Sequence, residues 1–453
     1  MSDTTAPQGL RARLPGLAAR ATGNTSVLLG STIAQAVLRF GSNVVVAQFL
    51  MPEDFSVVLV ISSLTFALML MTDAGVGPFI VRSERSTSKA ALDTVWTVNV
   101  LRGLFLAVGL YLAAPLAAEA FDDERLTGAI RVAAPFIGFA EFKNLGLYVA
   151  MRAHNERKNA LVRLGVYAAH LPILVGAAWW LGNYWALVVA VAATCTLTTV
   201  ASYLFYPERH ALRLDRAALG DLWRFSRLIA ASSLVGLVVA QFDRFFLAAV
   251  APKDLLGVYY LAATLVMTAE DLIHRYGRNV YMPIVSDGLR AGERTPRVYY
   301  DPMRLVRPGL LFLIAMGIPL GPAFFAVVFK PEYAAGGVLL SLLSVRTLLA
   351  MLNQPAEAFL IADGRQRTVL VANGIRLAWT VGLGTAAYFA FGIYGLIVAI
   401  CLRDLLPILT QHVALARAGV LSARREAVVP VVVAGGLAIG LAANAVAAAM
   451  GLV

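Results

Sequence analysis

The chain has 453 residues, of which 59% are hydrophobic and only 14% charged, and its formal net charge is +11. Soluble domains carry about 25% charged residues, so this composition excludes a water-soluble globular protein and predicts an all-α protein that crosses a membrane many times. The two cysteines, Cys195 and Cys401, lie in apolar runs, which favours buried thiols over a disulfide or a metal pair. The polar, basic start leads into a full-length apolar run, so no cleavable signal peptide is predicted.

Thirteen mainly apolar stretches are long enough to cross the hydrocarbon layer. In chain order they are 27–50, 55–81, 94–118, 127–151, 159–182, 184–206, 224–250, 255–282, 305–329, 336–361, 367–391, 393–417 and 427–450. We therefore expect a basic segment (1–26), a first block of six spans (27–206), a linker (207–223), a second block of six (224–417) and an additional C-terminal helix within 418–453.

Lysine and arginine are unevenly distributed between the connections. The N-terminal segment and every second connection after it are basic, whereas the alternate connections hold only Arg125, Lys253 and Lys330. The positive-inside rule predicts that the N-terminus and the basic connections are cytoplasmic. Topology and anionic lipid headgroups then account for the net charge, and no nucleic-acid partner is expected.

The connections are too short to hold a soluble domain. They contain no phosphate-binding loop and no metal-ligand cluster, so neither an ATP-driven transporter nor a metal or cofactor site is predicted. A membrane polymerase or glycosyltransferase remains an alternative, but it would need a large loop with catalytic acids. The candidates Asp122 and Asp123 are typical of a solvated loop, and no catalytic residue is predicted.

Two stretches resemble each other at an offset of 200 residues. They are "QFLMPEDFSVVLVISSLTF" (48–66) and "AAVAPKDLLGVYYLAATLV" (248–266), and the offset aligns Pro52 with Pro252, Asp54 with Asp254 and Val58 with Val258. A second echo pairs "GNYWALVVA" from Gly182 with "GIYGLIVA" from Gly392. Hairpin turns often converge on Pro, Gly and Asp, but we favour a parallel 6+6 repeat, in which the substrate site lies between the halves.

Charged side chains inside the spans are the candidates for that site. A charge near the bilayer centre costs about 2.5–3.5 kcal/mol on insertion scales, so each normally faces a cavity or a partner. Because arginine binds phosphate in a bidentate manner, a cavity that gathers arginines suits an anionic headgroup. The candidate substrate-binding residues are Arg39, Asn43, Arg244, His274, Arg275 and Arg346. The candidate counterions or ion-coupling residues are Asp73, Asp243, Glu270 and Asp271.

Internal ion pairs that only fix helices together are the alternative for each of these charges. For Glu141 and Lys143 in the fourth span we favour such a structural pair.

Three stretches resemble polysaccharide and oligosaccharide flippases of the multidrug, oligosaccharidyl-lipid and polysaccharide exporter superfamily. They are "AQFLMPEDFSVVLVISSLTFALMLMTDAGVGPFIVRSE", "QFDRFFLAAVAPKDLLGVYYLA" and "VFKPEYAAGGVLLSLLSVRTLLAMLNQPAEAFLIADGRQR". The first contains an Asp-x-Gly-x-Gly element formed by Asp73, Gly75 and Gly77, followed by Arg82. The resemblance covers the first twelve spans, and the thirteenth departs from a family that commonly has twelve or fourteen.

The resemblance implies two six-helix lobes around a V-shaped central cavity and transport by alternating access. The implied cargo is an undecaprenyl-pyrophosphate-linked oligosaccharide, turned from the cytoplasmic to the periplasmic leaflet of a bacterial inner membrane during O-antigen (lipopolysaccharide), capsule or exopolysaccharide biosynthesis. Polysaccharide polymerase and chain-length machinery are the implied protein partners. A cation-coupled multidrug antiporter of the same superfamily is the alternative, although its cavity should be more acidic or aromatic.

Overall fold

The computed structural model describes residues 30–31, 33–72, 75–82, 88–153, 155–304 and 306–450, and every regular element within these ranges is helical. The first helix is Ile33–Val46. The first half of the chain continues with α2 (Pro52–Met71), α3 (Val76–Arg82), α4 (Lys89–Ala120), α5 (Arg125–Phe139), α6 (Gly146–Arg152), α7 (Glu156–Leu181) and α8 (Trp185–Phe205).

The second half begins with α9 (Arg216–Val250) and α10 (Lys253–Tyr276). It continues with α11 (Met282–Arg290), α12 (Pro296–Tyr300), α13 (Val306–Val328), α14 (Ala335–Ala362), α15 (Gln366–Ala378), α16 (Gly384–Cys401), α17 (Leu405–Arg417), α18 (Ala423–Glu426) and α19 (Val428–Ala449). Two π-helical turns, Gly277–Tyr281 and Trp379–Leu383, join α10 to α11 and α15 to α16.

Within the described residues, each of the thirteen predicted spans falls on a helix or a run of helices. Within the described residues, nine helical segments are long and apolar enough to cross a membrane, and Gln366–Arg417 forms one of them. That segment contains two predicted spans, and its kink is at Gly392, whose φ of 68° and ψ of −157° suit only glycine. Gly182 begins the stretch that resembles the one from Gly392. It also has a positive φ, 61°, and it ends α7.

Three predicted spans are broken rather than continuous. The second ends its first helix at Met71 and resumes at Val76 after Gly75, whose φ is 59°. The fourth is interrupted between Phe142 and Gly146, and the twelfth between Cys401 and Leu405. Each break contains polar residues, as at Lys143 and Asn144 or at Arg403 and Asp404, but each is too short to divide the apolar run around it.

The break in the fourth span is stabilised by side chains that replace the lost helical hydrogen bonds. The backbone N–H of Asn144 donates to Ser202 Oγ at 2.8 Å, and the N–H of Leu145 donates to His210 Nε2 at 3.1 Å. The N–H of Gly146 donates to Asn144 Oδ1 at 2.8 Å. Non-helical backbone within a membrane protein requires such partners.

The predicted linker is shorter than expected, because α9 already begins at Arg216 with Asp215 as its N-cap. The segment before it runs along α4. The backbone N–H groups of Ala211, Arg213 and Asp215 donate to Asp93 Oδ1 (3.1 Å), Thr97 Oγ1 (2.9 Å) and Thr94 Oγ1 (2.9 Å), respectively. The connection between the halves is therefore fixed to the first half.

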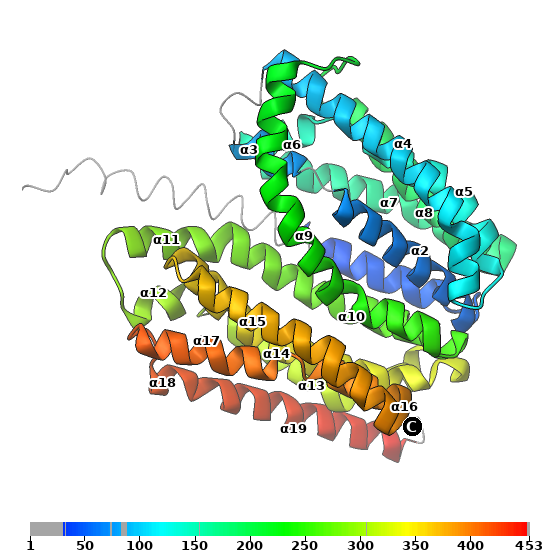
Figure 1. The fold of residues 1–453 in the computed structure, drawn as a ribbon. Coiled ribbons are helices and arrows are strands. Elements are labelled where there is room, and N and C mark those ends of the chain that lie inside the picture. Colours follow the sequence, from blue (N-terminus) through cyan, green and yellow to red (C-terminus); the bar gives the residue numbers. More distant parts are fainter. Residues whose placement is uncertain are drawn as a thin grey trace, which may run out of the picture.

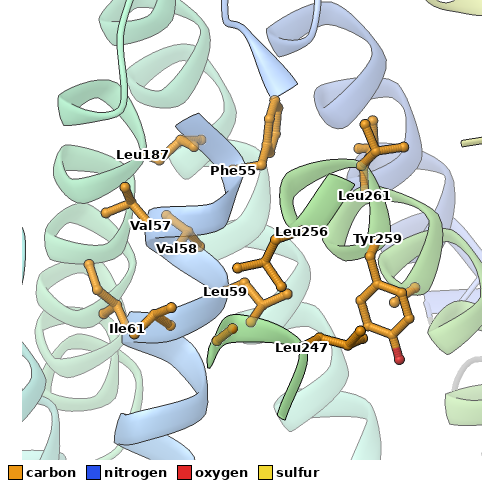
Figure 2. Close-up of a cluster of buried hydrophobic side chains, with 14 of the residues drawn as sticks. Phe55, Val57, Val58, Leu59, Ile61, Leu187, Leu247, Leu256, Tyr259 and Leu261 are labelled. Atoms are coloured by element: carbon orange, nitrogen blue, oxygen red, sulfur yellow. The ribbon is translucent and has the colours of Figure 1, made fainter. Parts of the chain in front are cut away.

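The helices of the two halves gather in two groups, and α9 runs between them (Figure 1). The groups meet along α2 and α10, the helices that contain the two stretches similar at an offset of 200 residues. There the helices approach so closely that a Cβ built on Gly257 would lie 1.7 Å from the carbonyl oxygen of Pro52. Figure 2 shows the shared apolar core, in which Val57 and Leu59 of α2 lie among side chains of α8, α9 and α10.

The halves also touch through polar and aromatic contacts near the same turns. Tyr333 Oη donates to the carbonyl oxygen of Leu50 at 2.9 Å, and the Lys253 ammonium donates to the carbonyl oxygen of Phe121. The ring of Phe121 stacks on Phe245 with centroids 6.3 Å apart. These contacts, together with the α2–α10 crossing, are called the turn-end closure below.

Candidate functional site

The second half holds a buried ionic network on three helices. Asp243 of α9 and Arg346 of α14 are 3% and 8% exposed. Arg346 Nη2 lies 3.1 Å from Oε1 of Glu270 on α10, and its Nη1 lies 3.8 Å from Asp243 Oδ2. The hydroxyl groups of Tyr259 and Thr347 donate to Asp243 Oδ2 and Glu270 Oε1, both at 2.7 Å.

This network compensates the charge of Arg346 with two carboxylates. Such a triad connects α9, α10 and α14, and removing one member would leave a charge unpaired in a buried place. Asp243 Oδ1 has no hydrogen-bond partner among the described residues. The predicted roles of Arg346 in substrate binding, and of Asp243 and Glu270 as counterions or coupling residues, stay predictions.

A second, more open ion pair joins the two halves. Arg39 of the first helix lies 3.6 Å from Asp271 of α10, measured from Nη2 to Oδ2, and the side chains are 28% and 46% exposed. Arg244 of α9 reaches the same stretch of α10, since Met267 lies one helical turn before Asp271. Arg244 makes only a weak contact, 3.4 Å from its Nη2 to Met267 Sδ. The structure thus brings Arg39, Arg244 and Asp271 to one seam between the halves.

The remaining predicted residues lie around this seam or outside the described part. Asn43 is half-buried, and its Nδ2 has no hydrogen-bond partner among the described residues. His274 is exposed, with Nδ1 3.0 Å from Gln354 Nε2. Arg275 is half-buried and forms no ion pair with a described residue. Asp73 lies outside the described residues.

The first half contains a polar pocket of about 230 Å³ that sequence reasoning missed. Asn99 and Arg102 of α4 line it together with Glu141, Lys143 and Tyr148, beside the breaks in the second and fourth spans. Glu141 lies 3.5 Å from Lys143 Nζ, the pair predicted as structural, and 3.7 Å from Arg102 Nη1. Asn99 and Arg102 share a helix face inside a span, the signal used for Arg39 and Asn43, so they could have been found.

A second cluster, also missed, stabilises the break between α16 and α17. Arg376 Nε donates to Asp404 Oδ1 at 2.8 Å, and Arg376 Nη2 lies 3.9 Å from Glu357 Oε2. Arg403 Nε lies 3.9 Å from Asp404 Oδ2. These charges are mutually paired beside a helix break, which is a structural arrangement.

An apolar pocket of about 350 Å³ lies on the same helix as Arg39. Ala36, Val37 and Phe40 line it, facing Leu265 of α10 and Phe324 of α13. Charged and apolar surfaces therefore adjoin on one short helix. Within the described ranges, no group of three His, Cys, Asp or Glu side chains lies close enough to hold a metal ion.

Solved structures of two membrane transporters share the fold. An inward-facing MATE transporter of the MOP superfamily superposes with a TM-score of 0.65 and 14% identity, covering 88% of this chain and 99% of the other. The lipid II flippase MurJ in an inward closed conformation also gives a TM-score of 0.65, with 11% identity over 93% of this chain and 98% of the other. At these identities the likeness concerns the fold alone.

Sequence comparison places the chain in a family. The teichuronic acid biosynthesis protein TuaB of Bacillus subtilis (strain 168) is 21% identical over 305 residues, which are 66% of this chain and 62% of that relative. The match thus spans less than two thirds of the relative's length. Residues 45–329, more than half of the chain, match the polysaccharide biosynthesis protein family. The chain belongs to the polysaccharide biosynthesis protein family, and its fold is the one seen in the MATE transporter of the MOP superfamily and in MurJ.

Proposed function

We propose that the protein moves an undecaprenyl-pyrophosphate-linked oligosaccharide from the cytoplasmic to the periplasmic leaflet of a bacterial inner membrane. Residues 27–206 and 224–417 act as two six-helix lobes of a parallel repeat, and α19 is an additional helix. Family membership supports a transporter for polysaccharide biosynthesis. The observation that carries the ligand class is the half-exposed ion pair between Arg39 and Asp271, which joins the two halves one helical turn from the contact of Arg244 with Met267.

The chemistry of that seam suits an amphiphile with an anionic headgroup. Guanidinium groups form strong charge-assisted hydrogen bonds with phosphate oxygens. The pair between Arg39 and Asp271 is long and half-exposed, so a pyrophosphate could displace Asp271 at small cost. The apolar pocket beside Ala36, Val37 and Phe40 offers a neighbouring surface for the polyprenyl chain.

The turn-end closure supports an alternating-access mechanism. It holds the halves together at the end where α2 and α10 begin, whereas the ion pair of Arg39 and Asp271 lies deeper and is more exposed. By the predicted orientation this closed end is periplasmic, and the open side faces the cytoplasm. Cargo would enter from the cytoplasmic leaflet and leave after the closure opens.

Native mass spectrometry of the protein extracted gently from its own membrane tests the proposal. We expect a co-purifying polyprenyl-pyrophosphate glycan that is lost in the double variant Arg39→Ala/Arg244→Ala. Arg131→Ala is the matched control, because Arg131 is exposed on α5 and stacks only over Tyr111.

Retention of the glycan by the double variant would remove these arginines from the mechanism. Bulk phospholipid alone, together with saturable binding of cationic drugs, would instead identify the cation-coupled multidrug antiporter.

A further inference from the structure

A pocket of about 420 Å³ lies where α13 meets α18 and α19, away from the seam between the halves. Arg304, Arg307 and Arg425 line its polar side. Leu311 of α13 and Val429 and Val432 of α19 line its apolar side. It lies at the membrane face that carries the basic connections, at the start of a spanning helix.

Arg307 is a buried cation with unused donors. Its side chain is 7% exposed, and its Nε and Nη2 atoms are buried without a hydrogen-bond partner in the described part of the chain. Its one ion pair, from Nη1 to Glu426 Oε1, is long at 3.5 Å. The Nε and Nη2 atoms are closed off from the pocket, so Arg307 acts on a bound anion through its charge, which Glu426 compensates only at long range.

The carboxylates near the pocket are already engaged. Glu426 Oε1 accepts a hydrogen bond of 2.7 Å from the hydroxyl group of Tyr300, and Asp301 Oδ1 accepts one of 2.6 Å from Arg425 Nη1. Arg304 is exposed and forms no ion pair with any described residue. The pocket therefore keeps an excess of positive charge, in which Arg304 is an exposed donor and Arg307 is a buried charge.

The apolar wall distinguishes this pocket from a site for a soluble anion. A phosphate ion would leave Leu311, Val429 and Val432 in contact with water, whereas an acyl chain would cover them. Both chemistries occur together in a membrane phospholipid, and basic pockets between helices near the headgroup level are known to hold such lipids.

We propose that this pocket binds one anionic phospholipid, with its phosphate at Arg304 and Arg425 beside the charge of Arg307, and an acyl chain along the wall of α13 and α19. The lipid fastens α19 to α13 and is distinct from the transported cargo. This site does not depend on the proposed function, since none of its residues belongs to the seam between the halves.

Native mass spectrometry and thermal unfolding of the purified full chain in a neutral detergent test the site. Phosphatidylglycerol, phosphatidylcholine and sodium phosphate are each titrated. We expect one tightly retained phosphatidylglycerol and a rise in melting temperature that phosphatidylcholine and sodium phosphate do not give. In Arg304→Gln/Arg425→Gln the affinity for phosphatidylglycerol should fall about tenfold or more, because two cations near the phosphate are lost.

The matched control is Arg213→Gln/Arg216→Gln, which removes two exposed arginines from another basic connection and should leave affinity unchanged. Val432→Phe fills part of the space for the acyl chain and keeps every charge. It should therefore weaken phosphatidylglycerol binding in a protein that folds normally. The proposal is overturned if the Arg304/Arg425 variant binds as the control does, if phosphatidylcholine binds equally well, or if sodium phosphate stabilises as strongly as the lipid.

Discussion

Arg346 is the residue whose substitution should most strongly reveal the buried network of the second half. Arg346→Met leaves Asp243 and Glu270 without their cation, so we expect a loss of about 3–5 kcal/mol in stability. Thermal unfolding in detergent measures this. Adding Asp243→Leu and Glu270→Met removes the stranded charges and should restore much of the melting temperature.

The same triple variant separates structure from ligand binding. If Arg346 only holds α9, α10 and α14 together, transport should recover with stability. If the arginine also contacts the headgroup, transport should stay low in the stable triple variant. A single Arg346→Met variant as stable as the parent would contradict the network's structural role.

His210 should make the connection between the halves sensitive to pH. Burial, with the nearby charge of Lys89, lowers the pKa of His210 to about 4, and its Nε2 accepts a hydrogen bond from the N–H of Leu145. In the unfolded segment the imidazole of His210 takes up a proton below about pH 6.5. In the docked segment it takes up a proton only near pH 4. Docking is therefore complete above about pH 6.5 and weakens as the pH falls toward 4.

Hydrogen exchange of residues 206–215, corrected for the intrinsic pH dependence of exchange, measures this effect. We expect less protection at pH 5 than at pH 7. His210→Gln keeps an acceptor but cannot titrate in this range, so its protection should not change between the two pH values. An equal pH effect in His210→Gln would assign the effect to another group.

At the scale of elements, the crossing of α2 and α10 depends on one glycine. Gly257→Ala places a Cβ against the Pro52 carbonyl group, since an ideal Cβ at this position would lie 1.7 Å from the oxygen, so the helices must separate. We expect a loss of at least about 2 kcal/mol in stability, as for other overpacked contacts. Gly109→Ala on α4 is the control, since a Cβ built there would meet no described atom within 4 Å apart from its chain neighbours and its own helix backbone.

Thermal unfolding compares the two variants. Gly109→Ala should be neutral or more stable, because alanine favours a helix over glycine by about 1 kcal/mol. Equal melting temperatures for the two alanine variants would show that the crossing tolerates a wider spacing.

The positions of the helices were predictable because hydropathy reports length and burial in lipid. The span predicted at 94–118 lies within α4, and the boundary placed between 391 and 393 coincides with the kink at Gly392. The break at Asn144 was not predictable, since its partners Ser202 and His210 come from distant parts of the chain. No local periodicity encodes such a contact.

The site was predictable in part for the same reason. The sequence singled out Arg39, Asp243 and Arg346 as candidates because a charged residue is rare inside an apolar span. The carboxylates were named as candidate counterions, but the arginine with which each one pairs was not identified, since pairing depends on how helices pack. Arg39 with Asp271 joins residues on different helices, and only the three-dimensional fold brings them together.

At the scale of the whole molecule, the turn-end closure must open if cargo leaves at that end. Gln48 Nε2 lies 3.3 Å from the carbonyl oxygen of Val328, on opposite halves. Gln48→Cys/Val328→Cys, with Cys195 and Cys401 replaced by alanine, should form a cross-link that abolishes flipping in proteoliposomes. Reduction should restore it.

A pair within the first half provides the control. Glu119→Cys/Glu124→Cys spans the turn between α4 and α5, where both side chains are exposed, and should cross-link without loss of flipping. Full activity of a quantitatively cross-linked Gln48/Val328 variant would contradict movement between the halves.

The contact between α13 and α19 has a consequence for biogenesis. Gly436 and Gly440 let α19 approach α13 so closely that a Cβ on either would lie 2.5 Å or less from the carbonyl oxygen of Phe312 or Met316. The ribosome makes α13 long before α19, so the receiving surface on α13 faces lipid until α19 leaves the translocon. We therefore expect membrane insertion to include a late docking of α19 on α13, and substitution of either glycine should delay this step.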